Sequence, residues 1–240
     1  MIKKERLDKV LSNMGYGSRK EMKQCIKNGR VIVNGQIAKN NSIKVDPYKD
    51  EINIDGEIIE YKKYIYIMMN KPKGVISSTR DPFSSTVLDL LDRKYLSFSP
   101  YPVGRLDKDT EGLLILTNDG RFTHKLLSPK NRVNKKYYVE VDGYVDEKHI
   151  SLFKDGIILD DGYKTLDSKL EIIESNYISK VYLTIIEGKF HQVKRMFEAI
   201  DMEVVYLKRM SMGNIKLDEK LLPGEYRELS KEEIQNFKKE

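Results

Sequence analysis

The fold is decided by the stretch Val103-Gly-Arg-Leu-Asp-Lys-Asp-Thr-Glu-Gly-Leu-Leu-Ile-Leu-Thr-Asn-Asp-Gly120. A short turn carries Arg105 and Asp107, and the apolar run 113–116 that follows is typical of a strand buried on both faces. A carboxylate at the mouth of such a strand is held rigidly and partly shielded from water, and Arg105 and Lys108 favour its ionised form. Asp107 is therefore either an anionic nucleophile or an ordinary turn-capping residue.

Outward from this stretch, strand and helix patterns mix without a regular strand–helix rhythm. Strands are predicted near residues 64–69, 112–117, 135–142, 168–174, 178–187 and 203–210. Helices are predicted near residues 120–127, 146–154, 190–199 and 230–238. The mixed order and alternating strands favour an α+β domain over residues 62–240, with a mixed and mostly antiparallel sheet.

The strand Lys135-Lys-Tyr-Tyr-Val-Glu-Val141 holds two adjacent tyrosines, Tyr137 and Tyr138. Adjacent residues in a strand face opposite sides, so at most one of these rings can reach a site on a given face. Two ordinary sheet aromatics fit the same pattern.

The segment Glu187-Gly-Lys-Phe-His-Gln-Val-Lys-Arg-Met-Phe197 predicts a helix. Its expected apolar stripe consists of Phe190, Val193, Met196, Phe197 and Ile200. At about 100° per residue, Lys194 then skirts the buried edge and Arg195 points outward. A basic group at a core edge needs a carboxylate partner, and Asp107 is the natural candidate. His191 and Gln192 are expected to contact RNA or its sugar, with an exposed bystander as the alternative for His191.

Residues 1–60 predict a smaller α/β module. Helical spacing at residues 7–14 and a capping box at Ser18–Glu21 indicate two short helices, and Asn34-Gly35 indicates a hairpin. Cys25 is expected to fill the core. One helical face carries the lysines, and two arginines flank it; the residues predicted to contact a phosphate backbone are Lys20, Lys23, Lys27, Arg19 and Arg30.

Charge is unevenly distributed along the 240 residues, whose net charge is +6. Residues 1–44 hold eleven Lys or Arg and three Asp or Glu, a net +8, and the remaining chain carries −2. Such a concentration on a small unit is typical of a nucleic-acid binder, and a solvated surface face is the plainer alternative.

The composition also bounds the class of protein. No apolar run approaches the roughly 18 residues of a membrane span, and the charged start is unlike a signal peptide, so we expect a cytoplasmic protein without a membrane partner. With one cysteine and three histidines, we expect no disulfide and no metal site.

The wording G-R-L-D-x-D-T-x-G-L-L-x-L-T-N-D-G closely resembles the central motif of bacterial pseudouridine synthases of the RsuA/RluB type. The resemblance implies that Asp107 is the catalytic residue and that Arg105 displaces the target base from its stack. The family's K-x-Y-x-V places its active-site tyrosine on Tyr137, which would stack on the base and help remove a proton. The wording E-G-x-x-H-Q-V-K-R-M places the basic residue that pairs with the aspartate on Lys194, where many relatives have arginine. Asn70-Lys-Pro-Lys-Gly74 resembles the family's first motif.

Residues 5–56 resemble the S-four RNA-binding domain, which implies RNA binding but no particular reaction. Together the resemblances imply an isomerase that converts a ribosomal RNA uridine into pseudouridine on an extruded nucleotide, without a cofactor. The wording H-Q-V-K-R-M-F and P-G-E-Y-R-E-L is most like the branch acting on small-subunit 16S RNA, free or in an assembly intermediate. A large-subunit 23S enzyme and a non-catalytic RNA-binding assembly factor are the alternatives. We expect a monomer, with Arg195, His191 and Gln192 among the RNA contacts.

Overall fold

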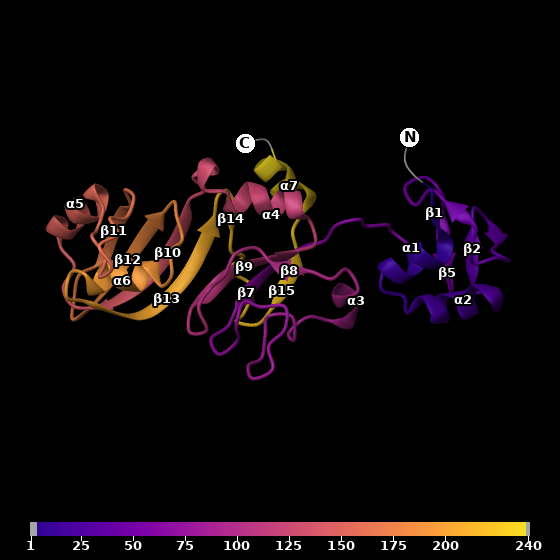
Figure 1. The fold of residues 1–240 in the computed structure, drawn as a ribbon, viewed down its shortest axis with the longest axis horizontal. Coiled ribbons are helices and arrows are strands. Elements are labelled where there is room, and N and C mark those ends of the chain that lie inside the picture. Colours follow the sequence, from indigo (N-terminus) through magenta and orange to yellow (C-terminus); the bar gives the residue numbers. More distant parts are fainter. Residues whose placement is uncertain (1–3, 239–240) are drawn as a thin grey trace. The chain divides into compact units, whose positions relative to one another are not determined.

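A computed structural model of the chain describes residues 4–238, in two compact units (Figure 1). The N-terminal unit runs through to Ile65 and includes Leu91–Pro100. The second unit comprises Tyr66–Leu90 and the chain from Tyr101 onward. In the part of the chain that is described, no helix is both long enough and apolar enough to cross a membrane.

The N-terminal unit packs two helices against a small antiparallel sheet of order β3-β2-β5-β6. Its elements are β1 (Glu5–Arg6), α1 (Leu7–Asn13), α2 (Arg19–Lys27), β2 (Val31–Val33), β3 (Gln36–Ile37), β4 (Lys44–Val45), β5 (Ile52–Ile54), β6 (Glu57–Ile58) and α3 (Arg93–Leu96). The predicted capping box is confirmed, because Ser18 Oγ accepts from the Glu21 N–H and the Glu21 carboxylate accepts from the Ser18 N–H. The predicted Asn34-Gly35 hairpin is confirmed too, with both residues at positive φ.

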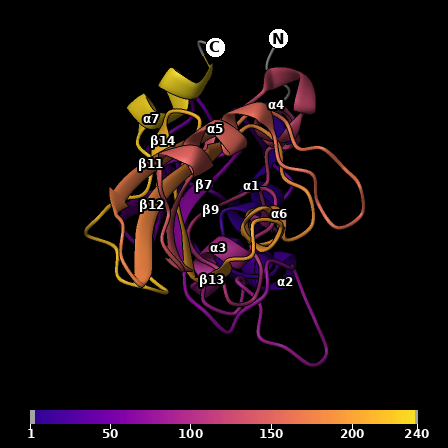
Figure 2. The same ribbon diagram turned by 90° about the vertical axis from the view of Figure 1, so that its left-hand side faces the viewer.

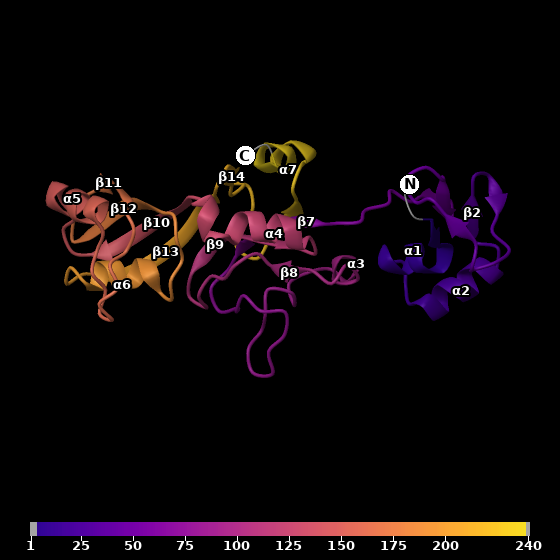
Figure 3. The same cartoon turned by 45° about the horizontal axis from the view of Figure 1, so that its top comes forward.

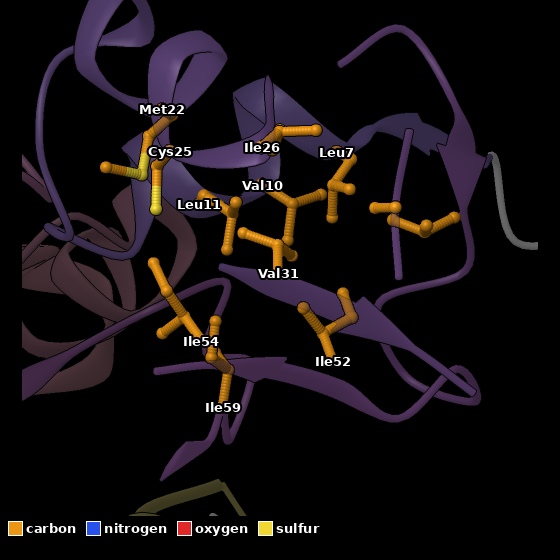
Figure 4. Packing of buried hydrophobic residues seen from close by; sticks show 12 residues of the cluster. Leu7, Val10, Leu11, Met22, Cys25, Ile26, Val31, Ile52, Ile54 and Ile59 are labelled. Atoms are coloured by element: carbon orange, nitrogen blue, oxygen red, sulfur yellow. The ribbon is translucent and has the colours of Figure 1, made fainter. Parts of the chain in front are cut away.

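The core of this unit is almost wholly aliphatic (Figure 4). Side chains from the two helices face those of the sheet; the labelled members are Leu7, Val10, Leu11, Met22, Cys25, Ile26, Val31, Ile52, Ile54 and Ile59. Cys25 is 4% exposed, so its predicted place in the core is confirmed. Burial raises the pKa of the Cys25 thiol, which keeps it protonated and unreactive.

The second unit is built on one nine-stranded sheet, and the predicted α+β class is confirmed. Its main order is β11-β12-β10-β13-β9-β7-β15, with β14 paired to β13 and β8 paired to β9. The strands are β7 (Tyr66–Lys71), β8 (Tyr101–Pro102), β9 (Glu111–Thr117), β10 (Lys135–Asp142), β11 (Lys169–Glu174), β12 (Ile178–Ile185), β13 (Glu203–Met212), β14 (Ile215–Lys216) and β15 (Tyr226–Glu228). Each predicted strand exists within a few residues of its expected bounds.

The helices of this unit lie over different parts of its sheet (Figures 1 and 3). They are α4 (Gly120–Leu127), the 3-10 turn Pro129–Asn131, α5 (Glu147–Asp155), α6 (Gln192–Glu198) and α7 (Lys231–Lys238). The core against β7 and β9 includes Phe122 and Leu126 of α4. Seen from the β11 end of the sheet, α5 lies near β11 (Figure 2).

The sheet consists of two antiparallel parts that meet at a single parallel pair, β9 with β13. Residues 113–116 of β9 are fully buried, which confirms the predicted strand with two covered faces. At the junction Gly112 has φ +101°, and a Cβ there would lie 2.3 Å from the carbonyl oxygen of Arg209. Only glycine permits this approach, so the junction also fixes the loop that enters β9.

Candidate active site

The candidate site lies at this junction, where residues 104–110 lead into β9. The register of the sheet sets Arg209 of β13 opposite both Gly112 of β9 and Tyr137 of β10. The loop that carries Asp107 therefore comes from one part of the sheet, and the tyrosine strand comes from the other.

The loop is tied down by a lysine that the sequence analysis did not single out. Lys71, at the end of β7, is fully buried. Its Nζ donates to the carbonyl oxygens of Pro72 at 3.0 Å, Asp107 at 2.9 Å and Thr110 at 2.9 Å. Burial lowers the pKa of Lys71 to about 8, against the attraction of nearby carboxylates. The backbone on both sides of Asp107 is thus held by one buried amine.

Asp107 itself is partly open to solvent, with 32% of its side chain exposed. Its Oδ1 lies 3.6 Å from Nε2 of His191. His191 has a left-handed backbone, φ 47°, and its ring stacks on Phe190 with the centroids 3.8 Å apart. The structure therefore brings His191 to the carboxylate, a pairing that the sequence did not predict.

A pocket of ≈140 Å³ opens beside Asp107 and is lined from both parts of the sheet. Tyr137 forms part of its wall and is 7% exposed. Tyr138 faces the other side of the sheet, where its ring meets Tyr182 and Tyr206. The prediction that only one of the two tyrosines can reach the site is confirmed. Asp107 is the one carboxylate among the described residues that line the pocket.

The predicted pairing of Lys194 with Asp107 is wrong in this structure. Lys194 lines the pocket, but its Nζ donates to Asp109 Oδ2 at 2.5 Å. That hydrogen bond lowers the pKa of the Asp109 carboxyl. Helical periodicity correctly predicted that Lys194 lies at the edge of the buried face. It carries no information on which of two carboxylates in the same loop, Asp107 or Asp109, the lysine binds.

Two further predictions for this segment are also wrong. The helix begins at Gln192, so Phe190 lies outside it and is 76% exposed instead of joining the apolar stripe. Arg195 was expected to point outward, but only 14% of its side chain is exposed, because it pairs with Asp160 and Asp161 of a covering loop. The helical periodicity of this segment gives no information on a loop about 35 residues away in the sequence.

Gln192 is buried, and both ends of its amide are engaged within the protein. Its Nε2 donates to Glu187 Oε1 at 2.7 Å, and its Oε1 accepts from the Lys189 N–H at 2.9 Å. These bonds brace the turn that presents His191. Its contact with RNA stays a prediction.

A wider groove of ≈940 Å³ shares the residues around Asp107. Its other wall is the segment 76–81, and its exposed cations are Arg105, Lys108 and Lys189. Arg105 thus lies at the rim of the pocket beside the carboxylate. The groove is several times larger than the pocket, which has the size of a single ring system.

In the N-terminal unit, Lys20, Lys23 and Lys27 line one surface hollow, which confirms that they share a face. Arg19 is exposed at the start of the same helix. Arg30 differs from these residues, because its guanidinium forms two hydrogen bonds with Asp55, at 2.7 and 2.5 Å. The pair leaves Arg30 less available to phosphate than the three lysines.

Several buried polar residues at the site were missed by the sequence analysis, namely Lys71, Thr110 and Arg209. A signal existed for two of them. Lys71 is the last residue of the mostly apolar strand β7, and Arg209 is in phase with the inward-facing Leu207 of β13. Among residues 4–238, no three His, Cys, Asp or Glu side chains are arranged to hold a metal ion.

Comparison with known families agrees with this architecture. Residues 5–52 match the S4 domain, and residues 65–199 match the family described as RNA pseudouridylate synthase. The chain belongs to the RNA pseudouridine synthases of the RsuA/RluB type, and it is therefore an isomerase with an appended S4 domain.

Individual relatives span nearly the whole chain. An RNA pseudouridine synthase, YtzG, of Bacillus subtilis (strain 168) is 51% identical over 95% of this chain and 96% of its own. Ribosomal small subunit pseudouridine synthase A of Yersinia pestis and ribosomal large subunit pseudouridine synthase B of Bacillus subtilis are each 38% identical, over 95% and 98% of this chain and 96% of each relative. A crystal structure of a pseudouridylate synthase superposes with a TM-score of 0.68 at 37% identity, covering 97% of this chain and 99% of that one.

Proposed function

We propose that the protein converts a specific uridine of small-subunit 16S ribosomal RNA into pseudouridine. The observation that carries the proposal is a ring-sized pocket that has Tyr137 in its wall and Asp107 as the one carboxylate among the described residues that line it. The target nucleotide leaves its stack to enter the pocket, and Arg105 at the rim fills or props the gap.

The reaction breaks the bond between ribose C1′ and uracil N1 and rejoins the sugar to C5. Positive character builds on the ribose, and Asp107 stabilises or traps it as a nucleophile. Tyr137 stacks on the uracil and handles the proton that leaves C5. N1 gains a proton, so the product is an isomer of the substrate and no cofactor is consumed.

The pocket's charge pattern favours an isomerase over a hydrolase. A glycosidase uses two carboxyl groups, one of which activates water. Here the second nearby carboxylate, Asp109, is bound by Lys194. In the RNA-free protein Lys194 therefore holds the loop through Asp109 and does not bond to Asp107. It also places a positive charge in the pocket wall.

The choice of 16S RNA rests on sequence wording. H-Q-V-K-R-M-F at residues 191–197 and P-G-E-Y-R-E-L at 223–229 resemble the small-subunit branch. Relatives named for the small subunit and for the large subunit are similarly identical to this chain, so the RNA target is tested directly. The +8 N-terminal segment supports a structured RNA as substrate.

The test is tritium release from uracil-5-tritiated 16S and 23S RNA, offered free and in partially assembled particles. We expect release from 16S RNA, and Asp107→Asn should slow it by about 10³-fold or more. Asp142→Asn is the matched control, because it makes the same change at an exposed position of β10 outside the pocket.

Each other outcome assigns a different function. Release from 23S RNA alone would replace the small-subunit target. RNA binding without release from either RNA would identify a non-catalytic assembly factor. Equal release by the wild type and Asp107→Asn would remove Asp107 from the chemistry.

A further inference from the structure

The buried arginine of β13 is only partly satisfied by the protein. Arg209 is 2% exposed, and its Nε donates to the carbonyl oxygen of Leu113 at 2.8 Å. Its Nη2 is buried and has no hydrogen-bond partner. Across residues 4–238, no carboxylate forms an ion pair with it. A guanidinium stays charged in any protein environment, and burying it without a counter-charge is costly.

The position of this arginine connects it to the reaction. Arg209 lines the same pocket as Asp107 and lies opposite Tyr137 in the sheet. A second pocket residue, Thr110, also has a buried hydroxyl without a partner. Buried polar groups are normally paired, so two orphaned groups around one pocket indicate that a polar ligand completes them.

The surroundings indicate the charge of that ligand. Lys135 also lines the pocket, and burial lowers its pKa, with Arg209 adding to the shift. Lys71 lies behind the Asp107 loop, where Arg209 again disfavours its charged form. Lys135 and Arg209 thus line the pocket, and Lys71 lies close behind it. Such a concentration of positive charge best accommodates a ligand group that becomes negative during the reaction.

We propose that Arg209 stabilises the negative charge on the uracil ring after its bond to the ribose breaks. This inference rests on the proposed function and assigns a further catalytic residue to it. When the C1′–N1 bond breaks, its electron pair stays on the ring and spreads over N1 and the carbonyl oxygens. Arg209 Nη2 donates to one of those oxygens, and Thr110 Oγ1 contacts the same ring. The charge disappears when C5 bonds to C1′, the C5 proton leaves and N1 is protonated.

A purely structural role for Arg209 is the competing explanation, because its Nε joins β13 to Leu113 of β9. The two explanations differ in their consequences for stability. A charge kept for catalysis costs stability, so removing it while keeping a hydrogen-bond donor should not harm the fold. A structural arginine would give the opposite result.

The experiment compares Arg209→Gln, which keeps a donor for the Leu113 carbonyl, with Arg209→Lys, which keeps the charge. We measure single-turnover tritium release at saturating RNA, RNA affinity and the unfolding temperature of the full chain. Arg209→Gln should slow release by about 10²–10³-fold, with unchanged affinity, because the charge develops only after binding. It should unfold at or above the wild-type temperature, and Arg209→Lys should stay within about tenfold of the wild-type rate.

A wild-type rate for Arg209→Gln would overturn the proposal. So would equal slowing of both variants with equally lowered unfolding temperatures, or failure of both to fold, since each result assigns Arg209 to structure. The proposed function fails separately, if the wild-type protein releases no tritium from any ribosomal RNA in the same assay.

Discussion

The two units of this molecule treat charge in opposite ways. In the N-terminal unit the core is aliphatic (Figure 4). The buried carboxylate of Asp8 accepts two hydrogen bonds from Arg6 and one from Asn41. In the second unit Lys71 and Arg209 lie deep in the protein, and Arg209 is left with an unpaired donor. The first unit therefore carries its positive charge on the surface, where we expect an RNA backbone to bind, whereas the second unit buries cations at the proposed reaction pocket.

Of the variants that test this comparison, the largest change in reaction rate is expected for one of the two adjacent tyrosines of β10, Tyr137 and Tyr138. Tyr137→Phe should lower tritium release by about 10²-fold or more, since proton handling by a positioned side chain contributes about 10²–10⁴-fold. Tyr138→Phe is the matched control. The Tyr138 hydroxyl donates to Glu140 on the other face of the sheet, and burial together with this bond raises its pKa to about 12.

Single-turnover rates at saturating RNA measure both variants, with RNA affinity as the check on binding. Tyr138→Phe should stay within about twofold of the wild type. A wild-type rate for Tyr137→Phe would contradict a role of the Tyr137 hydroxyl in proton handling. Stacking of the ring on the uracil would then be the remaining role, and Tyr137→Leu would test it.

Much of the fold could be predicted because many local structures are determined by residues that are close together in the sequence. The capping box at Ser18, the Asn34-Gly35 turn and the apolar run 113–116 are each set by a few consecutive residues. The parallel pairing of β9 with β13 was not predicted, since it joins residues 97 positions apart in the sequence, such as Glu111 and Lys208. The candidate site depends on that pairing.

The predicted site residues likewise lie in short, recognisable motifs. Asp107, Tyr137 and Lys194 lie in motifs with distinctive wording, and the structure gathers all three around one pocket. The partner of Lys194 was wrong because a side chain's choice between Asp107 and Asp109 depends on loop geometry. The position of Lys71 at the end of an apolar strand hinted at burial, but its hydrogen-bond partners are backbone carbonyls, which no residue type in the sequence identifies.

The second prediction tests how the buried charge of the second unit affects stability. Lys71 has a folded pKa of about 8 and an ordinary value of 10.5. Between these values the unfolded chain binds more protons than the folded protein, so stability rises with pH. The cost of keeping Lys71 charged is fully present below pH 8 and disappears as pH approaches 10.5. The free energy of unfolding should therefore gain on the order of 1–3 kcal/mol across this window.

Urea unfolding of the wild type and of Lys71→Met between pH 7 and pH 10 isolates this contribution, because the variant lacks the group. The wild type should gain stability relative to Lys71→Met as pH rises. Parallel curves would mean that Lys71 is not strongly perturbed in the folded protein. The variant should also lose activity at every pH, because the carbonyl oxygens of Asp107 and Thr110 lose their donor.

The smallest effect is expected in the N-terminal unit, where Lys20, Lys23 and Lys27 share one exposed face. Replacing all three with glutamine should weaken RNA binding about tenfold at physiological salt. Each lost phosphate contact flattens the slope of log affinity against log salt by about 0.7–0.9, so the slope should fall by roughly 2–3. The rate at saturating RNA should not change, because these lysines take no part in the chemistry. The control replaces three exposed lysines of the second unit, Lys148, Lys216 and Lys220. If both triple variants flatten the salt slope equally, RNA affinity depends on the overall charge of the protein and not on this lysine face. That result would contradict the assignment of RNA binding to the N-terminal unit.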